Sequence, residues 1–219
     1  MAKKKNVTAD QILSWFMDYT LEKGENPKSV YAFAKEHNFE ESLFYQHFAS
    51  FQVIEEAVFK AFFDNADSLL KQDESFSTYS PQEKLLSFYF TFFEILTANR
   101  SYVVYALGKN RNKLKTLATL RPLRDSFRTF IKELGIESGD MKHEKIEKIK
   151  NRSIEEMAWA QLLLTLKFWI EDRSPSFEKT DLFIEKSVKA SFELLNTRPL
   201  ESVVDFGKFL FKERIKPNL

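Results

Sequence analysis

The side chains with the most specific chemistry in this chain lie within six residues of one another and are polar: Ser42, Tyr45, Gln46 and His47. Hydroxyl, phenol, amide and imidazole groups hydrogen-bond to phosphate oxygens and to base edges. The amide of Gln46 also matches adenine, which glutamine binds through two hydrogen bonds. The group therefore suits recognition of a nucleic acid.

Patterns typical of catalysis or metal binding are missing. The sequence has no cysteine, which excludes disulfides, thiolate zinc sites and cysteine nucleophiles and fits a reducing compartment. It contains no glycine-rich phosphate loop, no nucleophile elbow and no HExxH motif. The three histidines, at positions 37, 47 and 143, are scattered. We expect no enzymatic activity, no metal site and no cofactor.

The polar side chains must be positioned by two helices and the turn between them. Val30, Phe33 and Ala34 have the i, i+3, i+4 spacing of a buried helical face. Asn38 follows where the chain must turn, because asparagine tolerates the left-handed conformation that ends a helix. Ser50 has the hydroxyl that caps the next helix. Two helices joined by a short turn make a helix-turn-helix outline.

The second of these helices, residues 40–48, would enter the DNA major groove. We expect five of its side chains to be exposed: Glu41, Ser42, Leu43, Gln46 and His47. We expect three others to turn at least partly inward: Phe44, Tyr45 and Phe48.

Over roughly the first sixty residues, the sequence resembles the N-terminal domain of TetR-type transcriptional regulators. The matching positions are Gly24, Ser29, Val30, Phe33, Ala34 and residues 43–50, LFYQHFAS. The aromatic ending of the short helix, followed by a serine-capped helix, is the most specific part of the match.

The resemblance implies an all-α, TetR-like fold. Residues 1–50 would form a three-helix helix-turn-helix DNA-binding domain, and residues 51–219 a larger helical bundle for ligand binding and dimerisation. The family resemblance further implies a homodimer that binds an operator in double-stranded DNA, acts as a repressor and is controlled by a small hydrophobic ligand.

The sequence departs from the family pattern where charge matters. Glu40 and Glu41 stand where the family usually has serine and a basic or small residue, and Phe51 stands where it usually has a phosphate-contacting lysine. Residues 1–60 contain seven Lys, no Arg and nine Asp or Glu, a net negative balance that opposes phosphate binding. An alternative stays open: a TetR-fold protein that binds a lipid or isoprenoid, or a partner protein, and no longer binds DNA. A lipid-binding accessory protein of ubiquinone biosynthesis is one known use of that fold.

Three groups of residues are the candidate sites. The candidate DNA contacts are Lys3, Lys4, Lys5, Lys28, Ser29, Ser42, Leu43, Tyr45, Gln46 and His47. The candidate ligand contacts, each of which taken singly is more simply explained as packed core, are Phe88, Phe92, Phe93, Tyr102, Tyr105, Trp159, Leu163 and Trp169. The candidate dimer seam, whose spacing also fits an internal core face, is Val203, Val204, Gly207, Leu210 and Phe211.

The whole chain fits a helical protein. Of its 219 residues 43% are hydrophobic and 23 are Phe, with only five Gly and six Pro, and the net charge is +1. Because no signal peptide or membrane span is visible, we expect a soluble, cytoplasmic protein without a membrane partner. About nine or ten helices are expected. Their predicted starts and stops include Thr8, Gly24, Ser80, Gly135, Ser153 and Ser174.

Overall fold

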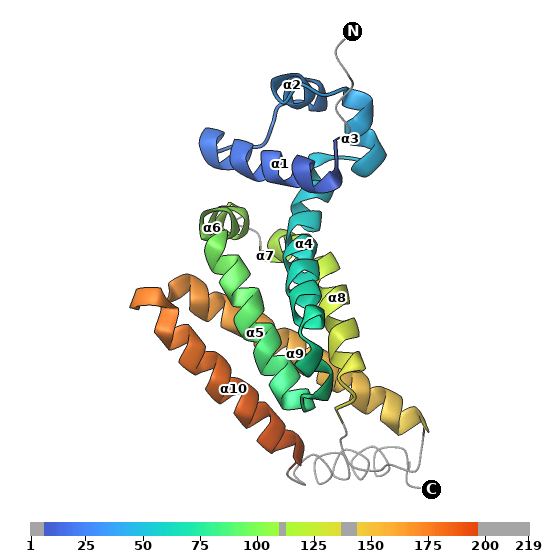
Figure 1. Ribbon diagram of the computed structural model, residues 1–219, viewed down its shortest axis with the longest axis vertical. Helices are drawn as coiled ribbons and strands as arrows, with labels where there is room; N and C mark the ends of the chain where they lie inside the picture. The colour runs from blue at the N-terminus through green and yellow to red at the C-terminus, as the bar shows by residue number, and fades with distance from the viewer. Residues whose placement is uncertain (1–6, 110–112, 137–143, 197–219) are drawn as a thin grey trace, which may run out of the picture. The chain divides into compact units, whose positions relative to one another are not determined.

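The computed structural model describes residues 7–109, 113–136 and 144–196 (Figure 1). Within these ranges the protein is all-α, as predicted, with ten α-helices, two 3-10 turns and no strand. The chain divides into two compact units. Unit 1 comprises Met1–Glu74 and Thr91–Phe130, and unit 2 comprises Ser75–Phe90 and Ile131–Leu219.

Unit 1 contains the N-terminal helices and part of the middle of the chain. Its helices are α1 (Ala9–Lys23), α2 (Val30–Glu36), α3 (Glu41–His47), α4 (Phe51–Gln72), α6 (Arg100–Gly108), α7 (Lys113–Thr119) and most of α8 (Arg121–Glu133). Figure 1 shows α1, α2 and α3 grouped at the start of the long helix α4. In this unit α2 packs against α3, and α1 packs against both α4 and α6.

Unit 2 is built mainly on two long helices. These are α9 (Glu144–Glu171) and α10 (Glu178–Asn196), which pack against each other and are joined by the 3-10 turn η2 (Pro175–Phe177). The turn η1 (Glu74–Thr78) precedes α5 (Pro81–Ala98), whose first half belongs to unit 2. No helix in the described part of the chain is long and apolar enough to span a membrane.

Most of the predicted helix ends are confirmed. Thr8 and Gln11 form the capping box of α1, with Gln11 N donating to Thr8 Oγ1 at 3.3 Å and Thr8 N donating to Gln11 Oε1 at 3.1 Å. Ser80 and Glu83 make the same reciprocal pair before α5. The ends at Gly24 and Gly135 have positive φ, as expected for glycine after a helix. These ends were predictable because each depends on contacts only a few residues apart.

One predicted helix start is wrong. The pattern from Ser153 to Glu156 was expected to open a new helix, but α9 runs through it without a break from Glu144 to Glu171. Residues 144–153 contain neither glycine nor proline, so nothing in them ends the preceding helix. A serine followed three residues later by glutamate also fits a helix interior, and here the longer helix prevails.

The expected domain boundary at residue 50 does not coincide with a limit between the two units. Unit 1 includes α4 and later helices as well as the first three. The proposed boundary concerns a division of function, and it stays a prediction.

Candidate nucleic-acid interface and apolar cavity

The helix-turn-helix is held together by an aromatic core. Phe33 in α2 is fully buried, and its ring centroid lies 6.4 Å from that of Phe44 in α3 and 5.6 Å from that of Phe51 at the start of α4. Phe51 also packs on Phe44, at 5.3 Å, and on Phe16 of α1, at 5.7 Å. One set of rings therefore fixes α1, α2, α3 and α4 against one another.

The turn between α2 and α3 has the predicted left-handed residue. Asn38 has φ of 62°, and the next amide, Phe39 N, donates to Ala34 O at 3.0 Å. Before α2, Ser29 Oγ accepts from Ala32 N at 3.1 Å and caps the helix. The caps and the turn set the direction in which α3 leaves α2, and so determine which side chains α3 exposes.

The exposed face of α3 is polar. Ser42, Gln46 and His47 are exposed as expected, while Phe44 and Phe48 are buried. Tyr45 is 55% exposed and so lies further outward than predicted, although its ring still contacts that of Phe44 at 5.4 Å.

Two side chains predicted to be exposed, Glu41 and Leu43, are half-buried. Glu41 lies three residues before the buried Phe44, and residues so spaced share one face of a helix.

His47 is held by a contact with the start of the described chain. Its ring atom Nε2 lies 3.0 Å from Val7 O. Because a carbonyl oxygen only accepts, Nε2 carries the hydrogen in this contact, and Nδ1 is the ring atom left to bind another group. The candidate contacts Lys3, Lys4 and Lys5 precede Val7 and lie outside the described residues.

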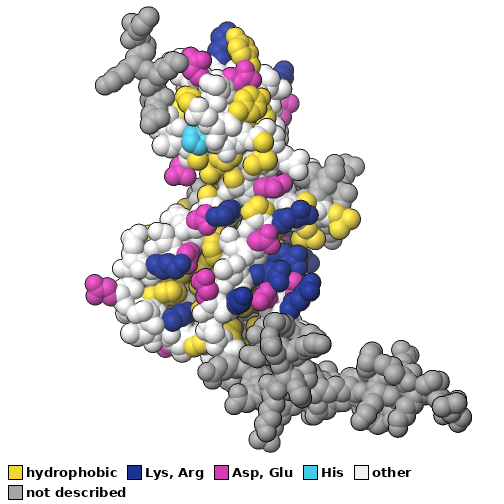
Figure 2. Space-filling model, turned by 90° about the vertical axis from the view of Figure 1, so that its right-hand side faces the viewer, with side chains coloured by type: hydrophobic (Ala, Val, Ile, Leu, Met, Phe, Trp, Pro, Cys, Tyr) yellow, Lys and Arg dark blue, Asp and Glu magenta, His cyan; other side chains and the backbone are white. Residues whose placement is uncertain are grey.

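The charge around α3 is mixed. Lys28 and Lys35 are exposed, and so is Glu40 immediately before the helix. On the face that Figure 2 shows, acidic and basic side chains are interspersed, with hydrophobic side chains between them. The position where the family usually has a lysine holds Phe51, whose ring belongs to the core described above.

A buried ionic cluster lies elsewhere in unit 1. Glu55 of α4 is buried; it forms an ion pair with Lys109 at the end of α6 and accepts a hydrogen bond from Asn26 Nδ2 at 2.6 Å. The hydroxyl of the buried Tyr102 has no hydrogen-bond partner among the described residues, and both burial and the nearby Glu55 raise its pKa. Tyr105 behaves similarly: burial and then Glu55 raise the pKa of its hydroxyl.

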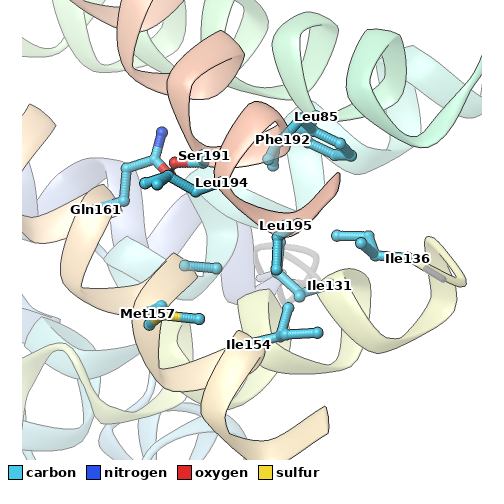
Figure 3. A pocket seen from close by; sticks show the side chains of 11 residues that line it. Leu85, Ile131, Ile136, Ile154, Met157, Gln161, Ser191, Phe192, Leu194 and Leu195 are labelled. Carbon is cyan, nitrogen blue, oxygen red and sulfur yellow. Dashed lines mark hydrogen bonds between the residues drawn. The ribbon is translucent and has the colours of Figure 1, made fainter. Parts of the chain in front are cut away.

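Unit 2 contains a cavity of about 280 Å³ that is partly open to solvent (Figure 3). Helices α5, α8, α9 and α10 contribute to its walls, together with Ile136 just after α8. The lining residues are Leu85, Ile131, Ile136, Ile154, Met157, Ala158, Gln161, Ser191, Phe192, Leu194 and Leu195. Met157 and Leu194 are at least half exposed and mark the rim. A largely apolar space with few polar groups is typical of small-molecule sites.

The polar side chains of the cavity, Gln161 and Ser191, face each other from α9 and α10. Ser191 Oγ donates to Gln161 Oε1 at 3.0 Å, and Gln161 Nε2 donates to Ser187 Oγ at 3.2 Å (Figure 3 shows the first pair). Sequence reasoning missed this pair. Gln161 was the available signal, since it interrupts the apolar stretch 157–166 of α9.

None of the eight candidate ligand residues lines this cavity. Phe88, Trp159, Leu163 and Trp169 belong to unit 2, and Phe92, Phe93, Tyr102 and Tyr105 to unit 1. Six of them are buried, and Leu163 and Tyr105 are half-buried. They serve as core here, and their contact with a ligand stays a prediction.

The candidate dimer seam lies outside the described residues. This applies to all five of its members: Val203, Val204, Gly207, Leu210 and Phe211.

Comparison with known proteins identifies the family. Residues 84–210, more than half of the chain, match the family model described as "Tetracyclin repressor-like, C-terminal domain". No curated protein matches the chain. The family match covers the C-terminal part, whereas the resemblance seen in the sequence covers the N-terminal helix-turn-helix, so the two rest on different residues. The chain belongs to the tetracycline repressor-like (TetR) family.

Proposed function

We propose that this protein is a cytoplasmic transcriptional repressor that binds operator DNA as a homodimer through α3 and is controlled by a small apolar ligand. The observation that carries the proposal is the exposed polar face of α3, formed by Ser42, Tyr45 and Gln46 on a tightly packed helix-turn-helix. Membership of the TetR family supports it.

In this proposal the side chains of α3 and its surroundings have separate roles. Gln46 reads a base edge, since its amide matches adenine, while Ser42 and Tyr45 hydrogen-bond to phosphate or bases. Lys28 and Lys35 supply the exposed positive charge near the helix, and Lys3, Lys4 and Lys5 are further candidates. The backbone N–H of Ser29 and its neighbours add phosphate contacts.

The test is binding of the purified full-length protein to labelled duplex from its own upstream region, between about 50 and 200 mM salt. We expect saturable binding with a dissociation constant of about 10 nM or below and a steep loss of affinity with salt. Gln46→Ala should weaken binding about tenfold or more. Gln72→Ala, an exposed amide at the far end of α4, is the matched control and should leave the affinity unchanged. Affinity no higher than for random duplex would overturn the proposal.

A second function is favoured by one specific observation. Phe51 occupies the position of the family's phosphate-contacting lysine and is packed in the aromatic core, and Glu40 and Glu41 lie at the start of α3. A chain that binds a lipid or isoprenoid, or a partner protein, without binding DNA would have these features. The same DNA titration separates the two functions, because only the regulator distinguishes its operator from random duplex.

A further inference from the structure

We infer that the cavity of unit 2 takes a neutral ligand: an apolar body of about ten heavy atoms with one uncharged hydrogen-bonding group that binds Gln161. The inference adds detail to the proposed function. It rests on that function only where it says that ligand binding regulates the protein. It concerns the chemistry of the ligand, which the family match does not determine.

The size of the ligand follows from the volume. A space of about 280 Å³ holds on the order of nine groups of about 30 Å³, the share of one water molecule in the liquid. The walls are made by branched and aromatic side chains such as Leu85, Ile131 and Phe192. Contact with these walls stabilises an aliphatic chain or a small ring by removing apolar surface from water.

The neutrality of the ligand follows from the lining. Among the described residues that line the cavity, none has an ionisable side chain. A carboxylate or ammonium group placed against these apolar walls would therefore lose hydration without gaining a partner of opposite charge from the described lining, which disfavours it. A hydroxyl group or the carbonyl group of a ketone or quinone loses much less hydration free energy when it is buried. One hydrogen bond to the protein compensates for that loss.

The hydrogen-bonding group is assigned to Gln161 because its amide lines the cavity and part of its hydrogen-bonding capacity is left. Gln161 Nε2 lies 3.2 Å from Ser187 Oγ and Gln161 Oε1 lies 3.0 Å from Ser191 Oγ, while the two serine hydroxyls also reach backbone acceptors, Ile184 O at 3.2 Å and Ser187 O at 2.9 Å. These contacts use one of the two amide hydrogens and one of the two oxygen lone pairs. One donor and one acceptor remain, which suits an alcohol or a carbonyl.

The first experiment is calorimetric titration of the full-length protein with four ten-carbon probes that differ in the polar group at or next to one end of the chain: 1-decanol, 2-decanone, decanoate and decylammonium. We expect the alcohol and the ketone to bind at least about tenfold more tightly than either charged probe. Equal or tighter binding of a charged probe would overturn the inference, since its head group would then sit at the open rim near Met157 and Leu194.

The second experiment changes Gln161 itself. Gln161→Leu should weaken the alcohol about tenfold and remove its advantage over decylammonium, and Gln161→Glu should reverse the preference in favour of decylammonium. The reversal is a readout that a merely structural role would not give. Ala158→Phe, which fills the cavity, should abolish binding of all four probes, while Gln72→Leu is the matched amide control and should change nothing.

The outcomes separate this inference from the proposed function. If no probe binds the wild-type protein, both the inference and the cavity's role in the proposed regulation are contradicted. Binding without preference for neutral probes removes the inference alone. Selective binding of decanol with no effect on operator affinity leaves the ligand assignment intact and contradicts the regulatory role.

Discussion

Lys109, at the end of α6, forms an ion pair with Glu55 of α4, and the side chain of Glu55 is only 10% exposed. Glu55 also accepts a hydrogen bond from Asn26, which lies between α1 and α2. A single carboxylate thus connects the segment before the helix-turn-helix, the long helix α4 and the end of α6. Its two partners lie 29 and 54 residues away in the sequence.

Removing one member of this pair should destabilise unit 1. Lys109→Met leaves the carboxylate of Glu55 buried without its cation, and we expect a loss of about 2 kcal/mol, below the roughly 3–5 kcal/mol of a fully buried pair because Lys109 is partly exposed. The double variant Glu55→Gln, Lys109→Met should lose less than the sum of the single losses, since no charge is left unpaired. Urea denaturation measures these losses. The control is Lys60→Met, which breaks the exposed Lys60–Asp64 pair and should cost about 0.5 kcal/mol or less. Equal losses for Lys109→Met and Lys60→Met would contradict the prediction.

Replacing Phe51 by the family's lysine should weaken the fold, and a DNA titration measures any phosphate contact that the lysine adds. The ring of Phe51 contacts those of Phe16, Phe33 and Phe44, so Phe51→Lys removes a half-buried part of the core, at about 2–3 kcal/mol. Chemical denaturation gives the loss, and a DNA titration at a temperature where the variant is folded gives the affinity. Val53→Lys, on the exposed side of the same turn, should change stability by no more than about 0.5 kcal/mol. A Phe51→Lys variant as stable as the parent would show that the ring contributes little.

Asn38 should be replaceable by glycine but not by alanine. With φ of 62°, alanine at this position would be strained by about 1 kcal/mol, whereas glycine adopts the conformation freely. We therefore expect a lower melting temperature for Asn38→Ala and little change for Asn38→Gly. Glu36→Ala, an exposed substitution in the preceding helix, serves as the reference. If alanine and glycine behaved alike, the turn would not need the left-handed conformation.

Asp172 should make unit 2 sensitive to acid. Burial raises the pKa of its carboxyl, but hydrogen bonds from the backbone and side chains of Ser174 and Thr180 lower it by more, to about 2. Because the folded pKa lies below the ordinary value of 3.8, the carboxylate stabilises the fold above about pH 4. That contribution is lost as the pH falls from about 4 towards 2.

The comparison of wild type with Asp172→Asn tests this sign. The variant should be less stable at neutral pH, because an amide nitrogen cannot accept the hydrogen bonds made to one of the oxygens. The difference in free energy of unfolding between wild type and Asp172→Asn, measured by urea denaturation, should shrink as the pH is lowered from about 5 to 3. Glu185→Gln, exposed on α10, should show no comparable trend. If the stability difference between the two proteins did not change with pH, the negative charge of Asp172 would not be the source of its stabilising effect.

How much was predictable depended on the range of the contacts involved. Thr8, Ser50 and Ser80 were correctly identified because each hydroxyl accepts from a backbone N–H three residues away, and Asn38 because its own backbone adopts the left-handed conformation. Ser153 misled because its local pattern is the same at a helix start and in a helix interior, and only the continuing helix decides between them.

The contents of unit 2 were not predictable in the same way. Large apolar side chains such as Phe88 and Trp169 look alike in sequence whether they fill a space or line it, and here they are fully buried. The cavity depends on how four helices pack, which no short window of sequence contains. Glu55 gave no local sign of burial either, since it stands beside a second glutamate, Glu56, and its cation comes from a distant helix.

The position of Phe51 also bears on how such a chain can evolve. One substitution would restore the lysine typical of the family, but it would first open a gap among four aromatic rings that hold α1, α2, α3 and α4 together. Exchange of this phenylalanine for a lysine therefore costs stability unless neighbours such as Phe16 or Phe44 change with it. Lys28 and Lys35, by contrast, are exposed, so a change of charge at either position leaves the four packed rings in place.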